Sequence, residues 1–285
     1  MTAKIIINQQ EPLLVFGGPY SNLQATLAVQ AEARRRGIRP SQVICTGDVV
    51  AYCGEPEETC QVIRDWGCHV IAGNCEEQLA AGAADCGCGF EEGTACDLLA
   101  RGWYPFANAR VSEQSRRWMA ALPSSLIFDG GGLRFRVIHG GVDVINRFIF
   151  ASDTNVIHEE LSRALADVVI AGHAGVPFVA RSGGKVWFNP GVVGMPANDG
   201  TADVWFGLIT PADAGVKLTT HRLAYDHRAA AAAMRRWGYA DGYAKSLITG
   251  IWPSFDVFPE IERSQTGQRL RARSMLVQGR AEKAA

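Results

Sequence analysis

The feature that most constrains the fold is an alternation of short apolar runs with helical segments early in the chain. Leu13–Phe16, Gln42–Asp48 and Cys68–Asn74 have the composition of buried strands. The stretches between them carry helix signals, such as the proline and acids that open Pro56–Gly67 and the glycine that closes it. Three strands that alternate with helices within about eighty residues predict βαβ units and a parallel sheet.

The first of these helices is expected to begin after Ser21, whose hydroxyl can cap it, and to end at the glycine of "RRRG". Leu23, Leu27 and Ala31 recur at helical spacing. We therefore expect these three side chains to form the buried face of the helix.

The rest of the chain predicts a helical insertion and then a more antiparallel group of strands. Residues 86–122 contain several aromatic side chains, and we expect them to form a helical cap near the site. Further strands are expected in a hairpin over 125–141 and at 167–175, 185–191, 202–209 and 216–226, and further helices at 153–167 (with Ile157, Leu161 and Leu165 aligned), 228–237 and 240–249. This order suits an α/β fold in which two mixed sheets pack face to face with helices outside.

We expect a single domain over residues 1–262, with its insertion at 86–122. The polar, basic segment over residues 263–285 is expected to be a flexible tail.

Composition argues against several classes of partner. The formal net charge is −1, so no protein-wide field attracts nucleic acid or an anionic membrane. No run of 18 or more apolar residues occurs, and the apolar run in "MTAKIIINQQEP" is too short for a secretory signal. We therefore expect a cytoplasmic protein without a membrane or nucleic-acid partner.

All eight cysteines lie between Cys45 and Cys96. Without a secretory signal, free thiols or metal ligands are expected rather than disulfides. No CxxC pair occurs, which argues against a zinc ribbon or knuckle. We expect most of these cysteines to be small, buried hydrophobic side chains.

Four potential metal ligands follow apolar runs: Asp48 in "TGD", Asn74 in "AGN", His139 in "IHGG" and His173 in "AGHAG". Adjacent glycines allow the backbone to turn sharply at these positions. A single histidine at a strand end is more often a structural residue held by hydrogen bonds, but four such side chains indicate a shared site. One carboxylate, one amide oxygen and two imidazoles suit iron, manganese or zinc.

Five sequence blocks occur in order: "GGPYSNLQA", "GDVVAYCGEPEE", "GNCEEQL", "IHGG" and "GHAGVP". They resemble the blocks D-x-H, G-D, G-N-H-[DE], a strand-end H and G-H-x-H of the calcineurin-like metallophosphoesterases, in particular of the small bacterial phosphodiesterase branch. The resemblance runs from about Leu13 to Trp252. It implies a four-layer α/β/β/α sandwich and, in the family, two metal ions bridged by the Asp of G-D.

The resemblance also implies that only one of these two metal sites is complete. The residues that match the ligands of one ion all keep suitable side chains: Asp48, Asn74, His139 and His173. Three of the four ligands of the other ion are replaced, since the matching positions are Gly18, Tyr20, Asp48 and Gly175. We therefore expect one divalent or trivalent ion per chain, either iron, manganese or zinc.

Three residues near this centre are candidate catalytic residues. Cys75 stands where the family has the histidine of G-N-H, and Glu76 stands in the acid position that follows. Because a thiol cannot donate a proton as an imidazolium does, Cys75 is predicted as a nucleophile, an additional ligand or a space-filling thiol. Tyr20 is predicted either as a phenolate ligand to a ferric ion or as a side chain that packs into the vacated pocket.

These residues favour a metal-dependent hydrolase that activates water on a phosphoester or related small-molecule substrate. Two histidines and a carboxylate are also the ligand set of mononuclear non-haem iron enzymes, which is one alternative. The replaced ligands leave another alternative, an inactive pseudo-phosphoesterase that binds a ligand or partner. The hairpin and the aromatic insertion offer faces for a homo-oligomer.

Overall fold

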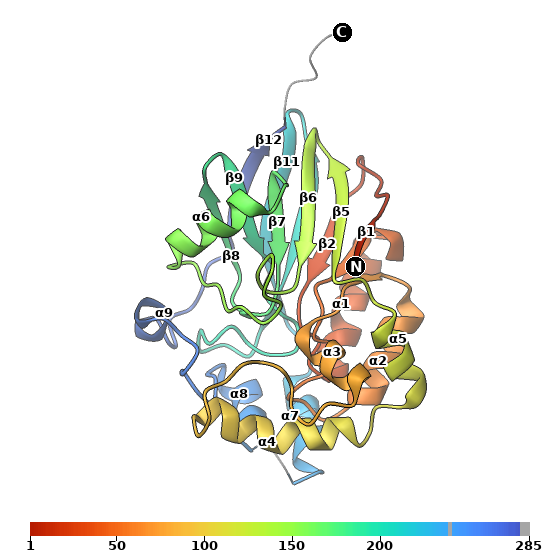
Figure 1. Cartoon of the computed structure of the whole chain (residues 1–285), viewed down its shortest axis with the longest axis vertical. Coiled ribbons are helices and arrows are strands. Elements are labelled where there is room, and N and C mark those ends of the chain that lie inside the picture. The colour runs from red at the N-terminus through yellow and green to blue at the C-terminus, as the bar shows by residue number, and fades with distance from the viewer. Residues whose placement is uncertain (239–240, 280–285) are drawn as a thin grey trace.

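Two mixed β-sheets pack face to face, and helices cover their outer surfaces (Figure 1). The structure is a computed structural model that describes residues 1–238 and 241–279. Within these residues each sheet has six strands. This arrangement is the four-layer α/β/β/α sandwich of mixed sheets that the sequence predicts.

Sheet I contains the three early apolar runs as parallel neighbours, and its other strands are antiparallel. In spatial order its strands are β12 (Ser274–Gln278), β11 (Gly215–Leu223), β10 (Val204–Ala212), β2 (Leu13–Phe16), β3 (Val43–Cys45) and β4 (His69–Val70). The parallel order β2, β3, β4 confirms the predicted βαβ units.

Sheet II contains the predicted hairpin, formed by β5 and β6, beside the parallel strands β6, β7 and β9. In spatial order its strands are β1 (Thr2–Lys4), β5 (Ser125–Gly130), β6 (Leu133–Ile138), β7 (Val168–Ala171), β9 (Lys185–Asn189) and β8 (Phe178–Ser182). Strands β1 and β8, the two edge strands of this sheet, are not among the predicted strands.

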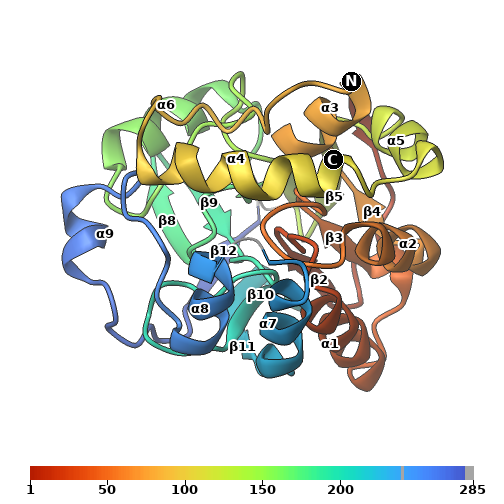
Figure 2. The same cartoon turned by 90° about the horizontal axis from the view of Figure 1, so that it is seen from below.

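Helices α1 (Leu23–Arg35), α2 (Pro56–Trp66) and α7 (His227–Arg235) lie on the outer side of sheet I, and α6 (Thr154–Arg163) lies on the outer side of sheet II (Figure 2). The remaining helices are α3 (Asn74–Ala81), α4 (Ala95–Asn108), α5 (Glu113–Ala120), α8 (Asp241–Thr249) and α9 (Glu260–Ser264), with a 3-10 turn at Pro40–Gln42. In the part of the chain that the structure describes, no helix combines the length and apolarity needed to cross a membrane.

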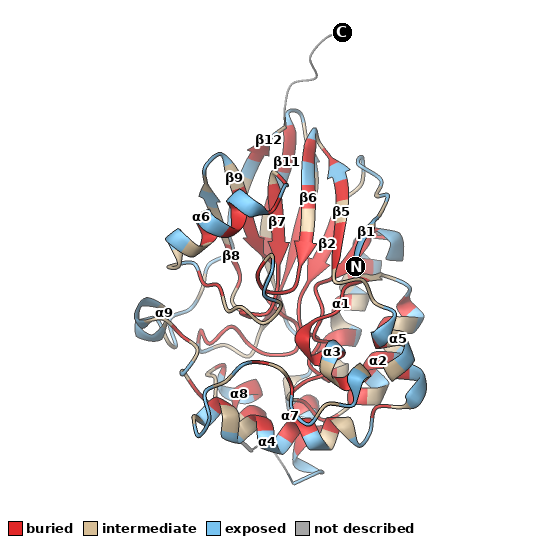
Figure 3. Ribbon diagram, in the orientation of Figure 1, coloured by how far each residue is buried: buried red, intermediate tan, exposed pale blue. Residues whose placement is uncertain are grey.

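The core between the sheets is built from alternate residues of each strand. In β2, Leu13 and Val15 belong to the apolar cluster between the sheets, whereas Leu14 and Phe16 pack against the helices. Since side chains of a strand alternate between its two faces, a strand covered on both sides is apolar throughout. Figure 3 shows the resulting burial along the strands of both sheets.

Helix α1 buries a different face from the predicted one. Ala25 and Val29 are buried, whereas the side chain of Leu27 is 45% exposed and Ala31 is exposed. Small side chains on the inner face let the helix approach the sheet and its neighbours closely, which leaves the larger leucine outside.

The cap of α1 is Asn22, not Ser21. The Asn22 side chain accepts a hydrogen bond from the backbone N–H of Ala25 at 3.1 Å. The hydroxyl of Ser21 is used elsewhere, since it accepts the backbone N–H of Ala51 at 3.2 Å.

Helix α6 is shorter than predicted and ends at Arg163. Leu165, expected on its buried face, has a left-handed backbone (φ 52°) and is 81% exposed. The chain turns there to enter β7, so helical periodicity no longer applies to this residue.

The expectation of a flexible tail does not hold for Ser274–Gln278, which form β12. This strand pairs antiparallel with β11, and Val277 is buried in the core between the sheets. The pairing satisfies backbone groups that would otherwise form a bare sheet edge. Residues 280–285, and Ala240 at the start of one predicted helix, lie outside the described residues.

Candidate metal centre

The four predicted ligands meet at one edge of the sandwich, where strands of both sheets end. Asp48 follows β3 of sheet I, and Asn74 is the first residue of α3 rather than the end of a strand. His139 and His173 follow β6 and β7 of sheet II. All four side chains are buried.

The polar atoms of these side chains are close to one another. Nε2 of His139 lies 3.2 Å from Oδ2 of Asp48, 3.0 Å from Nδ1 of His173 and 3.2 Å from Oδ1 of Asn74. Nδ1 of His173 lies 3.8 Å from Oδ2 of Asp48. One donor atom from each of Asp48, His139 and His173 lies within 4.8 Å of the other two, so these residues could hold a metal ion together.

Two of these residues have backbone conformations that are uncommon for side chains with a Cβ. The φ angle is 55° at Asp48 and 52° at His173, both in the left-handed region. Such conformations persist where the surrounding structure enforces them, and they concentrate at functional sites. The adjacent Gly47 allows the turn at Asp48, because a Cβ there would meet the backbone of Gly73 at 2.6 Å.

The orientation of His139 suits a metal ligand. Its Nδ1 lies 2.7 Å from the carbonyl oxygen of Thr46. Since a carbonyl only accepts hydrogen bonds, Nδ1 carries a proton, and in the neutral imidazole Nε2 presents its lone pair to the cluster. On His173, Nδ1 faces the cluster.

The amide of Asn74 is also oriented by the backbone. Its Nδ2 donates to the carbonyl oxygen of Cys86 at 2.9 Å and lies 3.3 Å from Sγ of Cys88. Because only the nitrogen side can donate to a carbonyl, the amide oxygen points at the cluster. Asn74 thus offers a neutral oxygen beside the carboxylate and the two imidazoles.

The electrostatics of the cluster are those of a buried carboxylate compensated by imidazole. Burial alone would raise the pKa of Asp48, but His139 and His173 outweigh it and hold this pKa well below its usual range. Burial alone would lower the pKa of His139, but the adjacent Asp48 reverses this and raises it. Burial lowers the pKa of His173, so this imidazole stays neutral.

Glu76 is buried, and both of its carboxylate oxygens accept backbone hydrogen bonds. The donors are the N–H groups of Asp48 at 2.7 Å, Val49 at 2.8 Å and Gly73 at 2.8 Å. Burial, and then the charge of Asp48, raises the pKa of Glu76 to about 7. These contacts tie the turn that carries Asp48 to the start of α3.

Cys75 is fully buried, and its Sγ lies 3.6 Å from Nδ2 of Asn74. An interaction with the Cys88 thiol favours ionisation, but burial and Asp48 outweigh it and raise the pKa of Cys75 well above its ordinary value. This environment favours the neutral thiol over the thiolate that nucleophilic attack requires. Seven of the eight cysteines are buried, which confirms the expectation that most are buried thiols.

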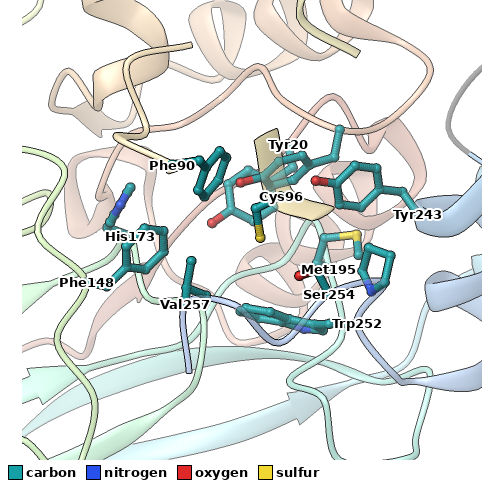
Figure 4. Close-up of a pocket in the computed structure, with 12 residues that line it drawn as sticks. Tyr20, Phe90, Cys96, Phe148, His173, Met195, Tyr243, Trp252, Ser254 and Val257 are labelled. Atoms are coloured by element: carbon teal, nitrogen blue, oxygen red, sulfur yellow. The ribbon is translucent and has the colours of Figure 1, made fainter. Parts of the chain in front are cut away.

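Tyr20 lies beside the cluster rather than within it. Its ring covers Gly18 and lines a pocket that also reaches His173 (Figure 4). Burial, and then the charge of Asp48, raises the pKa of the phenol well above 10, so the neutral form is favoured. The catalytic roles of Tyr20, Cys75 and Glu76 stay predictions.

The fold and the buried cluster together define a protein of the metallophosphoesterase class. The calcineurin-like phosphoesterase superfamily domain matches residues 22–210. Since this match spans more than half of the sequence, the chain belongs to the calcineurin-like phosphoesterase superfamily.

Relatives at low identity agree with this fold. An uncharacterised protein of Methanocaldococcus jannaschii is 24% identical over 241 residues, which cover 75% of this chain and 88% of that protein. A metallophosphoesterase from Sphaerobacter thermophilus superposes with a TM-score of 0.67 at 21% identity, over 84% of this chain and 99% of that one. A hypothetical protein from Pyrococcus horikoshii OT3 superposes with a TM-score of 0.72 at 16% identity, over 85% of this chain and 99% of that one.

Several residues around the centre are absent from the sequence-based predictions. The carbonyl of Thr46 orients His139, and Cys86 and Cys88 contact Asn74. The motif "CGCG" marks the two cysteines in the sequence, but only the fold places them against Asn74. A backbone carbonyl such as that of Thr46 leaves no signal in the residue types.

Proposed function

We propose that this chain is a metal-dependent hydrolase that holds one ion on Asp48, Asn74, His139 and His173 and acts on a phosphoester or a related small molecule. The convergence of one carboxylate, one amide oxygen and two imidazoles at a buried point between the sheets carries this proposal. Oxygens of Asp48 and Asn74 face that point, and each imidazole in its neutral form can turn a lone pair toward it.

When bound, such an ion supplies Lewis acidity: it draws charge from a substrate oxygen and lowers the pKa of water. Asp48 is the one anionic residue of the set, so with a divalent ion bound the site would carry net positive charge toward an anionic substrate oxygen. Glu76 acts as a positioning residue that holds the Asp48 turn. Tyr20, as a neutral phenol beside the cluster, can donate a hydrogen bond to the substrate.

The single-ion part of the proposal rests on the ligand positions that the second ion of the family would need. Gly18 and Gly175 have no side chain to offer, and the Tyr20 ring is folded over Gly18. Of the four positions that match the ligands of the second ion, only Asp48 keeps the residue type that the family uses as a ligand.

The proposal is tested by metal analysis and by a generic assay on the same preparations. Protein purified without added metal is expected to contain about one ion of iron, manganese or zinc per chain and to hydrolyse bis(4-nitrophenyl) phosphate. His173→Ala is expected to lose the ion and to lower the rate about 100-fold or more. His158→Ala is the matched control, since His158 is exposed and contacts Ser182 instead.

Hydrolysis that survives in His173→Ala at the wild-type rate would contradict the assignment. Two tightly bound ions per chain would contradict the single-ion part and direct attention to Tyr20 and Cys75 as replacement ligands.

The ligand set favours one second candidate. Asp48, His139 and His173 alone are the two histidines and one carboxylate typical of mononuclear non-haem iron proteins. A coloured, oxygen-sensitive iron form without phosphodiesterase activity would support that candidate. A colourless zinc or manganese form that hydrolyses the phosphodiester would exclude it.

A further inference from the structure

An aromatic pocket opens beside the candidate metal centre. Its walls include the rings of Tyr20, Tyr52, Phe148, Tyr243 and Trp252, and His173 lies at one side of it (Figure 4). His173 is also one of the proposed metal ligands. A small molecule in this pocket would therefore lie next to the centre.

Two of these aromatic rings cover the positions from which the second metal ligands are missing. A Cβ on Gly18 would collide with the ring of Tyr20, and a Cβ on Gly175 would lie 3.1 Å from Cη2 of Trp252. Both glycines have positive φ angles, 29° and 72°, which also disfavour a side chain. Where the family has metal ligands at these two positions, this chain has a glycine covered by an aromatic ring.

The aromatic wall is held in place by specific contacts. Nε1 of Trp252 donates to the carbonyl oxygen of Pro196 at 2.6 Å, and its backbone N–H donates to Oδ1 of Asn198 at 2.9 Å. On the opposite side, the ring of Tyr52 packs edge-on to Tyr20, with centroids 4.8 Å apart, and stacks on Tyr243 at 4.6 Å. Rings fixed in this way form a preorganised surface.

The pocket carries almost no charge. Its described lining contains no Lys, Arg, Asp or Glu, and His173 is its one imidazole. A dianionic phosphate seated in the pocket itself would lose its hydration without gaining a cationic partner. A flat apolar ring, in contrast, gains both burial and ring–ring contact with the walls.

We propose that this pocket binds an aromatic ring of the substrate, while the group that is hydrolysed reaches the metal centre past His173. The substrate class is an ester or related compound in which an aromatic ring is directly attached to, or one carbon away from, the reacting group. This inference rests on the proposed function. The rings of Tyr20 and Trp252, which cover the positions of the second metal site, form part of the surface that recognises this ring.

The test compares two ligands that differ only in the ring. Benzylphosphonate and methylphosphonate are titrated calorimetrically into protein that retains its purified metal. The wild type is expected to bind benzylphosphonate about tenfold or more tightly than methylphosphonate. Trp252→Leu is expected to reduce this ratio to about threefold or less, whereas Trp237→Leu leaves it unchanged. Trp237 is the matched control because it is 50% exposed and packs on Phe106, away from the pocket.

Equal affinity for the two phosphonates, a ratio unchanged in Trp252→Leu, or no binding of benzylphosphonate at millimolar concentration would overturn the inference. If Trp252→Leu does not fold, as judged by circular dichroism, Phe148→Leu on the other wall is expected to reduce the ratio in the same way.

A chelator separates this inference from the proposed function. If both are correct, the chelator weakens the binding of both phosphonates. The remaining affinity for benzylphosphonate still exceeds that for methylphosphonate. If the metal centre is wrong but the pocket is right, benzylphosphonate binds equally well with and without chelator. If the pocket is wrong but the metal centre is right, both phosphonates bind equally and both depend on the metal.

Discussion

At the scale of single residues, backbone groups hold the polar side chains of the centre. The Thr46 carbonyl orients His139, and the Cys86 carbonyl orients Asn74. Glu76 is held most firmly, since its two oxygens accept three backbone N–H groups. Because rotation of any of these side chains would break such a bond, the donor atoms are preorganised before a ligand binds.

Replacement of Glu76 is therefore expected to affect stability as well as activity. Glu76→Ala leaves three buried N–H groups without their acceptor, which is expected to lower the free energy of unfolding by about 3 kcal/mol or more. Urea denaturation measures the effect, with Glu77→Ala as the matched control because Glu77 is exposed on the same helix. A Glu76→Ala protein that is inactive but as stable as the wild type would show a catalytic acid rather than a positioning residue.

The thiols give a second prediction at this scale. Because seven of the eight cysteines are buried, native protein is expected to react with an aromatic disulfide reagent at no more than about one thiol within minutes. That thiol is expected to be Cys68, which is partly exposed, so Cys68→Ser should remove the fast phase. All eight should react in guanidinium. A fast phase that disappears in Cys75→Ser instead would identify Cys75 as an activated nucleophile.

At the scale of helices and strands, local sequence patterns predict where an element forms better than they predict which strand or surface it packs against. The alternation around Leu13–Phe16 and the start and stop signals of α2 are local, so the sequence predicts them. Strand β12 is different, because its five residues form a strand only against the open edge of β11. The inner face of α1 is likewise decided by the surfaces that the helix meets, not by its own spacing.

The same distinction applies to the site. Asp48, Asn74, His139 and His173 can be predicted because each follows an apolar run, and such ends converge at one edge of a sheet. The aromatic pocket cannot be predicted, because Trp252 reaches Gly175 only through the tertiary fold. Residue types alone do not distinguish a ring that lines a pocket from a ring in the core.

One contact between loops lies directly behind Tyr20 in the wall of this pocket. Gly194 lies so close to the turn before α1 that a Cβ would collide with the carbonyl oxygen of Pro19 and Cβ of Tyr20. Gly194→Ala is expected to lower the free energy of unfolding by at least about 2 kcal/mol and to weaken the benzylphosphonate preference by displacing Tyr20.

Gly102 provides the opposite case for comparison. It lies inside α4, is exposed, and a Cβ there would meet no atom of the described residues within 4 Å. Gly102→Ala is expected to raise the free energy of unfolding by about 0.5–1 kcal/mol, since alanine favours a helix interior. Denaturation midpoints that shift equally in the two variants would show that the close approach at Gly194 is not a constraint.

At the scale of the whole molecule, the candidate centre joins the two sheets. Asp48 and Asn74 belong to the side of sheet I, and His139 and His173 extend from strands of sheet II. An ion held by all four would therefore link the sheets at the edge where β3, β6 and β7 end. Only the folded chain brings these four residues together, so binding of an ion there would be coupled to folding.

Removal of the metal is consequently expected to destabilise the entire fold. An ion present at about 100 times its Kd contributes about 2.7 kcal/mol. For a chain of this size about 1 kcal/mol shifts Tm by roughly 2 °C, so a chelator is expected to lower Tm by about 5 °C. Re-addition of about one equivalent of the ion should restore it. His173→Ala should melt at the same temperature with and without chelator. A wild-type Tm that does not respond to the chelator would favour a metal-free scaffold, because a tightly bound ion between the sheets cannot leave without a loss of stability.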